Sequence, residues 1–489
     1  MILATATLGH ALSKAGLILD ALFAAEALCS LGRTRRIAVA ATLVLSPLLL
    51  AGALWKSTQA LHLRHHAPLA IAGIVVALAV VAILSAVLRS RPRLLALCAV
   101  VALPFRFSLI SGGTGGILLV LYVVIAAGAL ALVLWGERSD EPQVGWIERT
   151  LAVFVVLYAI GALYTPDLAR AAEEVCFFLV PFALLFVLLR RVHWDRALIE
   201  RCALALVALA LAFVAVAAVE YASRRLLFHT ALNSNQRFFR VNSLFYDPNI
   251  YGRFLALTMV AVAASMMWES RRRRVALAAA VLAVLWLGLL GSVSQSSIVA
   301  LLAGLAVIAA VRFPPRATAA AVVLVLVVVA AVAIGDSGRL HLNLSDTSSA
   351  NNATSGRASL VKEGASLFSD RPVAGFGSGS FSCEYLRHMA GTRNYLCGSP
   401  SPAGVTSDSH TTPITIAAEQ GTIGLLAYVA LLAAALATLG RGPLRRRPAR
   451  VAVLAAFVAL VVHTWAYADF LEDPITWALL AVGTVLARE

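Results

Sequence analysis

Long apolar runs recur along almost the whole of this chain, and they constrain its fold more than any other feature. Hydrophobic residues make up 61% of the 489 residues, and charged residues only 13%. An apolar helix of about 20 residues is long enough to cross the roughly 30 Å hydrocarbon core of a bilayer. Backbone groups inside lipid must satisfy their hydrogen bonds within the segment, so we expect the runs to be helices. The composition excludes an ordinary water-soluble globular protein.

The predicted fold class is all-α and polytopic, with about fourteen transmembrane helices. The predicted spans are residues 37–55, 68–88, 94–110, 117–135, 151–164, 173–189, 199–219, 250–268, 275–290, 296–311, 317–335, 412–439, 451–468 and 474–487. Residues 1–31 allow two interpretations, because Lys14, Asp20 and Glu26 interrupt them. They form either a polar-faced membrane helix or a helix at the membrane surface. They lack the pattern of a cleaved signal peptide.

The net charge of +15 is distributed in a way that argues against nucleic-acid binding. Basic residues gather in alternate short loops between the apolar runs, which is the pattern of cytoplasmic loops in membrane proteins. These loops contain Arg33/Arg35/Arg36, Arg89/Arg91/Arg93, Arg190/Arg191/Arg196, Arg271 to Arg274, Arg312/Arg316 and Arg441/Arg445/Arg446/Arg447/Arg450. They are expected to set topology and to contact anionic membrane lipids. The loops between them are then external.

One long polar insertion interrupts the apolar pattern. It divides the chain into a membrane part at 1–335, an external insertion at 336–411 and a second membrane part at 412–489. Within the insertion, residues 357–369 place apolar side chains at roughly helical spacing, which predicts an amphipathic helix lying on the membrane domain. Asp370-Arg371-Pro372 ends that helix. The glycine-rich stretch from Gly375 to Gly379 follows as a loop.

Two of the six cysteines, Cys383 and Cys397, lie in the insertion and enclose a short polar segment. An external compartment permits disulfides, so we predict that they pair; two free thiols are the alternative. The other four lie in or beside apolar runs, where a thiol acts as a small hydrophobic group.

The insertion also carries candidates for chemistry on an anionic substrate. Arg357 begins the predicted helix at headgroup height, where its planar guanidinium suits phosphate oxygens; an exposed surface arginine is the alternative. His410, close to Asp408, lies where the insertion returns to the membrane, and a histidine accepts a proton near neutral pH. Glu419, inside the next span, fits either catalysis or pairing with an arginine, because a carboxylate in a membrane helix usually faces a polar interior.

A second basic cluster lies in the predicted external loop 220–249. It comprises Arg224, Arg225, Arg237, Arg240 and, just inside the next span, Arg253. Arginines on the external side run against the positive-inside trend, so an anionic ligand or headgroup anchoring must account for them. Asp247-Pro248-Asn249 is typical of a turn that caps the following helix.

Several of these motifs, in this order, resemble the O-antigen ligase and O-antigen polymerase family. These are multispan glycosyltransferases that act on polyprenyl-linked glycans outside the cytoplasmic membrane. The resemblance covers the chain from about Asp247 to the C-terminus, and each motif alone is weak. It rests on Asp247-Pro-Asn-x-x-Gly, the small-polar hairpin at 291–297, Ser355-Gly-Arg357, Asp370-Arg-Pro-x-x-Gly-x-Gly-x-Gly-x-Phe381, Ser409-His410 and Glu419-Gln-Gly-x-x-Gly424-Leu.

The resemblance implies that Arg357 holds the donor phosphates and that His410 assists the acceptor hydroxyl. One position departs from the family. Its hairpin usually carries an arginine that helps to bind the donor, but here Gln295 stands between two serines. Either Arg240 or Arg253 replaces that arginine in space, or the donor carries one phosphate instead of two.

The sequence therefore predicts a glycosyltransferase of the bacterial inner (cytoplasmic) membrane with its active site on the external face. It would move a sugar or glycan from a polyprenyl-(pyro)phosphate donor to a hydroxyl of a lipid or glycan acceptor, with no cofactor and no metal. Asp247, Asn249, Gln295, Arg371 and Glu419 would support the site. The alternatives are a transporter or flippase for lipid-linked glycans, or a scaffold for envelope assembly.

Overall fold

The computed structural model describes residues 2–53, 55, 65–105, 118–136, 143–228, 239–317, 357–389, 397 and 408–488, and every regular element in them is helical. The first half contains α1 (Ile2–Cys29), α2 (Gly32–Ala53), α4 (Ala67–Ser90), α5 (Leu94–Ala102), α6 (Leu119–Trp135), α7 (Trp146–Gly161), α8 (Leu168–Glu173), the π-helix η1 (Glu174–Leu179), α9 (Val180–Arg190) and α10 (Arg196–Ser223). The second contains α11 (Pro248–Met267), α12 (Arg272–Ser292), α13 (Gln295–Arg312), α16 (Arg357–Asp370), α17 (Phe381–Met389), α18 (Thr412–Leu439), the 3₁₀ turn η2 (Leu444–Arg446), α19 (Pro448–Ala466) and α20 (Pro474–Leu486).

The described helices confirm an all-α, multi-pass membrane protein. Within this part of the chain, nine helices are long and apolar enough to cross a bilayer, and α6 and α20 are shorter apolar helices. The predicted number of fourteen is not reached here. The predicted span 94–110 contains the nine-residue α5, and 151–164 lies largely in the 16-residue α7. The predicted span 317–335 falls outside the described residues except at its first position.

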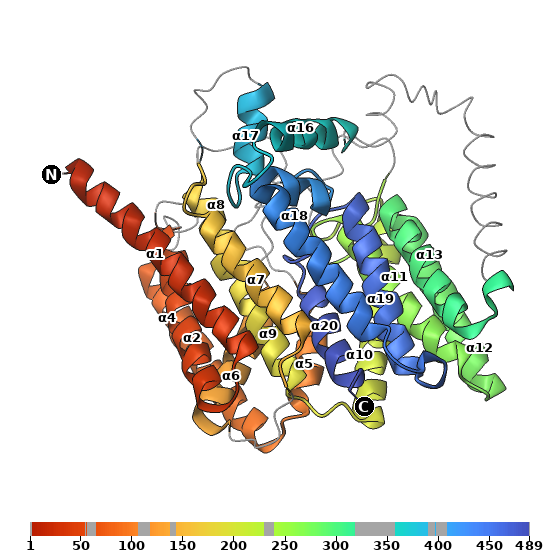
Figure 1. Ribbon diagram of the computed structural model, residues 1–489. Helices are drawn as coiled ribbons and strands as arrows, with labels where there is room; N and C mark the ends of the chain where they lie inside the picture. The colour runs from red at the N-terminus through yellow and green to blue at the C-terminus, as the bar shows by residue number, and fades with distance from the viewer. Residues whose placement is uncertain are drawn as a thin grey trace.

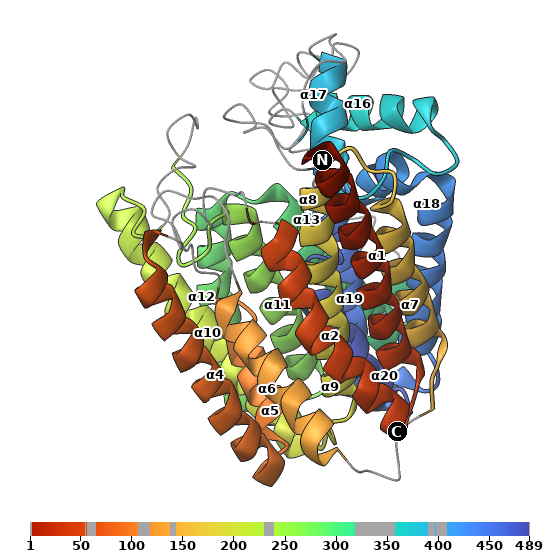
Figure 2. The ribbon, with the colours of Figure 1, turned by 90° about the vertical axis from the view of Figure 1, so that its left-hand side faces the viewer.

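The long helices form one bundle with two apolar cores (Figures 1 and 2). One core is built mainly from α1, α2, α5 to α9, α18 and α20, and the other from α10 to α13. Helix α19 contributes to both cores, through Leu454 and Phe457 to the first and through Ala455 and Leu460 to the second. The segment that follows α19 is therefore held between the two halves of the bundle.

The N-terminal helix α1 packs against α2, α7 and α9. Its Asp20 is fully buried, and Ser46 of α2 and Cys176 of η1 donate hydrogen bonds to the carboxylate. This packing favours the polar-faced helix over a helix resting on the membrane surface, because Asp20 is buried and accepts two hydrogen bonds inside the bundle.

The two helices of the insertion lie together at one end of the bundle, and the C-terminus lies at the other end (Figures 1 and 2). Helix α16 crosses the long helices roughly at right angles (Figure 1) and packs on α18. Its Leu367 is buried with Phe381 of α17 and Ala418 of α18. The predicted amphipathic helix is confirmed, although Ala365, expected on its apolar face, is exposed.

A kink in α18 receives the glycine-rich loop that joins α16 to α17. The backbone of α18 leaves helical geometry at Gly421, with φ of +62°. The freed carbonyl groups of Ala418 and Glu419 accept the N–H groups of Phe376 and Gly377, at 3.0 and 2.8 Å. A Cβ on Gly375 would lie 2.3 Å from the Glu419 carbonyl carbon, so this close approach requires glycine. The loop thereby fixes the insertion over α18.

The predicted disulfide between Cys383 and Cys397 is present, with the two Cα atoms 5.5 Å apart. It ties α17 to the segment that follows it. The remaining cysteines, Cys29, Cys98, Cys176 and Cys202, are free and at least partly buried.

Candidate active site

Three polar side chains from distant parts of the chain surround the ring of Tyr467, the residue that follows α19. The imidazole of His410 stacks on this ring with centroids 5.4 Å apart and an interplanar angle of 21°. The Arg357 guanidinium carbon lies 5.7 Å from the ring centroid. On the same ring, His463 of α19 lies at 5.6 Å between centroids. Tyr467 thus brings together the two residues that the sequence singled out in the insertion.

Arg357 begins α16 and reaches down to the end of α19. Its Nη1 donates to the carbonyl oxygen of Ala466 at 2.8 Å. This carbonyl belongs to the last residue of α19 and has no continuing helical turn to satisfy it. The contact anchors the arginine at the junction between the insertion and the bundle.

Arg240 approaches the same region from the loop before α11. Its Nε donates to the carbonyl oxygen of Ser292 and its Nη2 to Oδ1 of Asn249, both at 2.9 Å. Burial lowers the pKa of Arg240; Asp247 opposes that shift, and the positive charge of Arg357 adds to it. The positive charges of the two arginines therefore repel each other. An anion bound near both of them would relieve that repulsion.

Asp247 and Asn249 fix the start of α11 next to Arg240. Asp247 is the N-cap of α11, and its Oδ1 accepts the N–H of Asn249 at 2.6 Å, as the Asp-Pro-Asn pattern predicted. The Oδ1 of Asn249 accepts from both Arg240 and Ser294, the latter at 3.0 Å. Asn249 therefore connects Arg240 to the hairpin at 291–297.

His410 sits in a left-handed conformation, with φ of +53°. The Asp408 side chain stabilises this turn, since its Oδ1 accepts the His410 N–H at 2.6 Å. The same oxygen lies 3.4 Å from Nδ1 of the imidazole. Asp408 is thus positioned to orient the ring, and Nε2 is the ring nitrogen that does not face the carboxylate.

Arg253 has a different environment. Its guanidinium is 1% exposed, forms an ion pair with Asp473 at 2.8 Å and donates to the Ala468 carbonyl at 3.4 Å. Asp473 is the N-cap of α20. Arg253 thus joins α11 to the start of α20 inside the protein, whereas Arg240 is the arginine that contacts the hairpin.

The hairpin itself carries a buried hydroxyl cluster. The side chains of Ser296 and Ser297 lie 3.3 and 3.2 Å from Nε2 of His463, and Ser294 lies within hydrogen-bonding distance of both serines. Gln295, the first residue of α13, is exposed. The position where the family usually has arginine therefore points away from this cluster.

Glu419 and Arg371 support the insertion. The Glu419 carboxylate is buried and accepts the N–H of Phe381, the first residue of α17, at 3.0 Å. No ion pair of Glu419 with an arginine is found among the described residues. The Arg371 guanidinium stacks over Phe376 at 4.5 Å. Both contacts help to fix the glycine-rich loop.

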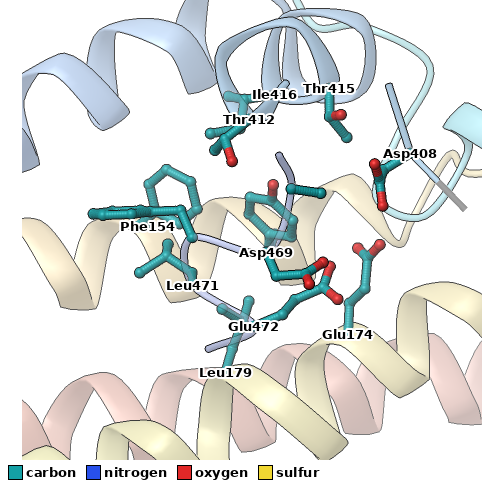
Figure 3. A pocket seen from close by; sticks show the side chains of 13 residues that line it. Phe154, Glu174, Leu179, Asp408, Thr412, Thr415, Ile416, Asp469, Leu471 and Glu472 are labelled. Atoms are coloured by element: carbon teal, nitrogen blue, oxygen red, sulfur yellow. The ribbon is translucent and has the colours of Figure 1, made fainter. Parts of the chain in front are cut away.

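A cavity opens beside Asp408, and neither Arg357 nor Arg240 is among its lining residues. Its walls come from α7, η1, α18 and the loop between α19 and α20 (Figure 3). Four carboxylate side chains line it: Glu174, Asp408, Asp469 and Glu472. The candidate site thus has a basic side with two arginines and an acidic side with four carboxylates.

A comparison with known protein families supports the family resemblance that the sequence motifs indicated. Residues 280–429 match the family model described as O-antigen ligase. This segment is similar to O-antigen ligases. It contains Arg357, the glycine-rich loop, His410 and Glu419, and the resemblance predicted from the sequence is confirmed. No curated protein matches the chain.

The O-antigen ligase match, together with the apolar helices, supports a membrane protein with glycosyltransferase-type activity in polysaccharide biosynthesis. The domain ends inside α18. Tyr467, Asp469, Glu472 and Asp473, which lie beyond it, were not singled out in the sequence. The sequence feature that could have identified them is their position: they are polar side chains at the end of an otherwise apolar run. Polar residues in such places usually face a protein interior.

Proposed function

We propose that this protein transfers a sugar or glycan from a polyprenyl-(pyro)phosphate donor to a hydroxyl group of an external acceptor. The observation that carries the proposal is the convergence of Arg357, His410 and Arg240 near Tyr467. Two guanidinium cations and an imidazole suit a reaction in which a phosphate leaves and a hydroxyl loses its proton.

Arg357 and Arg240 are the proposed ligands of the donor phosphate. Arg357 contacts the Ala466 carbonyl, and Arg240 contacts Ser292 and Asn249. The planar guanidinium of each residue suits phosphate oxygens. We do not include Arg253, because its ion pair with Asp473 is buried. In this proposal Arg240 replaces the arginine that the family hairpin usually supplies.

His410 is the proposed general base. The acceptor oxygen would attack the anomeric carbon of the donor sugar while its proton passes to Nε2 of His410. The bond between that carbon and the phosphate oxygen would break, and its electron pair would leave with the lipid phosphate, next to the two arginines. Asp408 would stabilise the imidazolium through Nδ1, which lies 3.4 Å from its carboxylate.

The proposal places the insertion 336–411 on the external face of the bacterial inner membrane, between membrane parts 1–335 and 412–489. The basic loops then lie on the cytoplasmic face. The anionic headgroup of the donor would reach Arg357 at the membrane surface while its polyprenyl chain remains in the lipid.

The test is a reaction of the purified full-length protein, in lipid nanodiscs, with a radiolabelled polyprenyl-linked glycan and acceptor glycolipid from the same envelope. We expect release of free lipid phosphate that depends on the acceptor. A transporter or flippase would move the donor across the bilayer without releasing lipid phosphate, so absence of release together with donor movement would overturn the proposal in favour of transport.

A further inference from the structure

The cavity beside Asp408 is separate from the arginines and has the opposite charge. Glu174 of η1, Asp469 and Glu472 of the loop before α20, and Asp408 line it (Figure 3). No lysine, arginine or histidine is among its lining residues in the described part of the chain. Arg170, behind the wall, lies 3.9 Å from both Glu174 and Glu472 and 2.9 Å from Glu173. Glu173, Glu174 and Glu472 thus share the guanidinium of Arg170.

Glu174 has a buried carboxylate oxygen that lacks a hydrogen-bond donor, and a ligand in this cavity could supply one. The residue is only 6% exposed. Its Oε1 lies 3.9 Å from Arg170, but its Oε2 has no hydrogen-bond partner among the described residues. A buried carboxylate oxygen without a donor is unfavourable, and proteins usually supply a partner. Glu174 lines the cavity, where a bound group would supply that donor.

A phosphate is a poor candidate for this partner, because four carboxylates would repel it. A metal ion is also disfavoured, since the described residues contain no group of three or more side chains with metal-ligand geometry. Hydroxyl groups fit better, because each one donates to a carboxylate and accepts in return. Burial raises the pKa of Glu472, although Arg170 opposes the shift.

Apart from Thr412 and Thr415, the rest of the wall is mostly apolar. Phe154, Tyr158 and Phe470 supply aromatic surface, and Leu179, Ile416 and Leu471 supply aliphatic surface. A sugar ring has the matching chemistry: hydroxyl groups around its edge and C–H groups on its faces. Apolar walls with a few convergent polar groups are characteristic of small-ligand sites.

We infer that this cavity is the subsite for a sugar unit of the acceptor, with Glu174 and Glu472 as hydroxyl-binding residues. The inference rests on the proposed function and adds to it where the acceptor is held. Asp408 connects the two sides, because it lines the cavity and also contacts the imidazole of His410. An acceptor sugar in the acidic cavity would thus lie next to the carboxylate that contacts the proposed base.

The experiment measures acceptor binding without requiring turnover. The probe is the saccharide released by mild acid from the acceptor glycolipid of the producing organism, added to full-length protein in nanodiscs and followed by microscale thermophoresis. We expect Glu174→Gln to weaken saccharide binding by about tenfold or more, as for loss of a charged hydrogen-bond partner. Glu472→Gln provides an independent second variant. Neither change should alter binding of the polyprenyl-linked donor.

Glu173→Gln is the matched control, because it removes the same charge one position away, from a residue that does not line the cavity. It should bind the saccharide as the unaltered protein does. Equal weakening by Glu173→Gln, unchanged binding by both cavity variants, or no saccharide binding by the unaltered protein would overturn the inference. Saccharide binding without lipid-phosphate release would instead contradict the proposed transfer while leaving the subsite intact.

Discussion

The imidazole of His410 stacks on the phenol ring of Tyr467, although one residue ends the polar insertion and the other follows a membrane helix. The same phenol ring carries the guanidinium of Arg357 at 5.7 Å. Tyr467 therefore serves as a platform that sets the position of both groups relative to each other.

Replacing Tyr467 with leucine should separate the effect of the ring from that of the hydroxyl group. Tyr467→Leu removes the surface for stacking and for the cation–π contact, which is worth roughly 0.5–2 kcal/mol. We expect kcat/KM for lipid-phosphate release to fall about tenfold or more. Tyr467→Phe keeps the ring and should retain most of the activity. An equal loss in both variants would show that the hydroxyl group matters instead.

Removing the guanidinium of Arg357 should weaken both donor binding and turnover. We expect Arg357→Ala to lose affinity for the polyprenyl-linked donor, and Arg357→Lys to recover only part, because a point charge does not reproduce the planar fork. Equilibrium binding and initial rates would measure the two effects. Arg196→Ala is the matched control, since the Arg196 side chain is 88% exposed and pairs with Glu200, four residues away on the same helix. If Arg196→Ala lost as much donor affinity as Arg357→Ala, the loss would reflect the reduced net positive charge and not a specific contact of Arg357.

Loss of the His410 imidazole should affect chemistry more than binding. His410→Ala should bind the donor nearly as well as the unaltered protein and turn over roughly a hundredfold more slowly, in line with the 10²–10⁴-fold contribution of a general base. Single-turnover rates beside donor-binding measurements would test this. Unaltered turnover in His410→Ala would rule out its role as base.

Adding a methyl group to Gly375 or Gly421 should destabilise the contact between the insertion and α18. Both residues have positive φ, and a Cβ at Gly421 would lie 2.3 Å from the Val373 carbonyl oxygen. We expect Gly375→Ala or Gly421→Ala to lower the free energy of unfolding by about 1–3 kcal/mol or more, seen as a lower Tm. Gly73→Ala, with open space around its Cβ position, should not lower Tm.

Docking of α17 on α16 should depend on pH through His388. This side chain lies 3.2 Å from both Glu363 and Asp370 of α16. The hydrogen bond to Glu363 raises the pKa of His388, burial opposes the shift, and Asp370 raises it further. A raised pKa means that the contact stabilises the fold fully below the ordinary histidine pKa of about 6.5. That stabilisation is lost as the pH rises through the higher folded-state value.

Hydrogen exchange of α17 measured across this pH range tests the expectation. Protection should decrease toward alkaline pH, and His388→Gln should remove most of this dependence. A pH profile that is the same in both proteins would assign the effect to other groups.

Local patterns in the sequence were enough to predict much of the secondary structure and the disulfide. The apolar runs predicted the all-helical membrane domain, the spacing within 357–369 predicted α16, and two cysteines in a polar segment predicted the disulfide. Each of these depends on hydropathy or on chemistry over a short stretch of chain. Arg357 and His410 were recognised from their places in the insertion, one at the start of the amphipathic helix and the other where the chain returns to the membrane.

The tertiary structure decided which of these groups meet. Arg253 and Arg240 were equivalent candidates in the sequence, but Arg253 pairs with Asp473 of α20 while Arg240 contacts the hairpin. Tyr467 and the acidic cavity likewise arise because α19 and the loop after it lie between the two cores. Ion pairs, stacking and cavities between distant segments depend on helix packing, and hydropathy along the chain carries no information about which helices become neighbours.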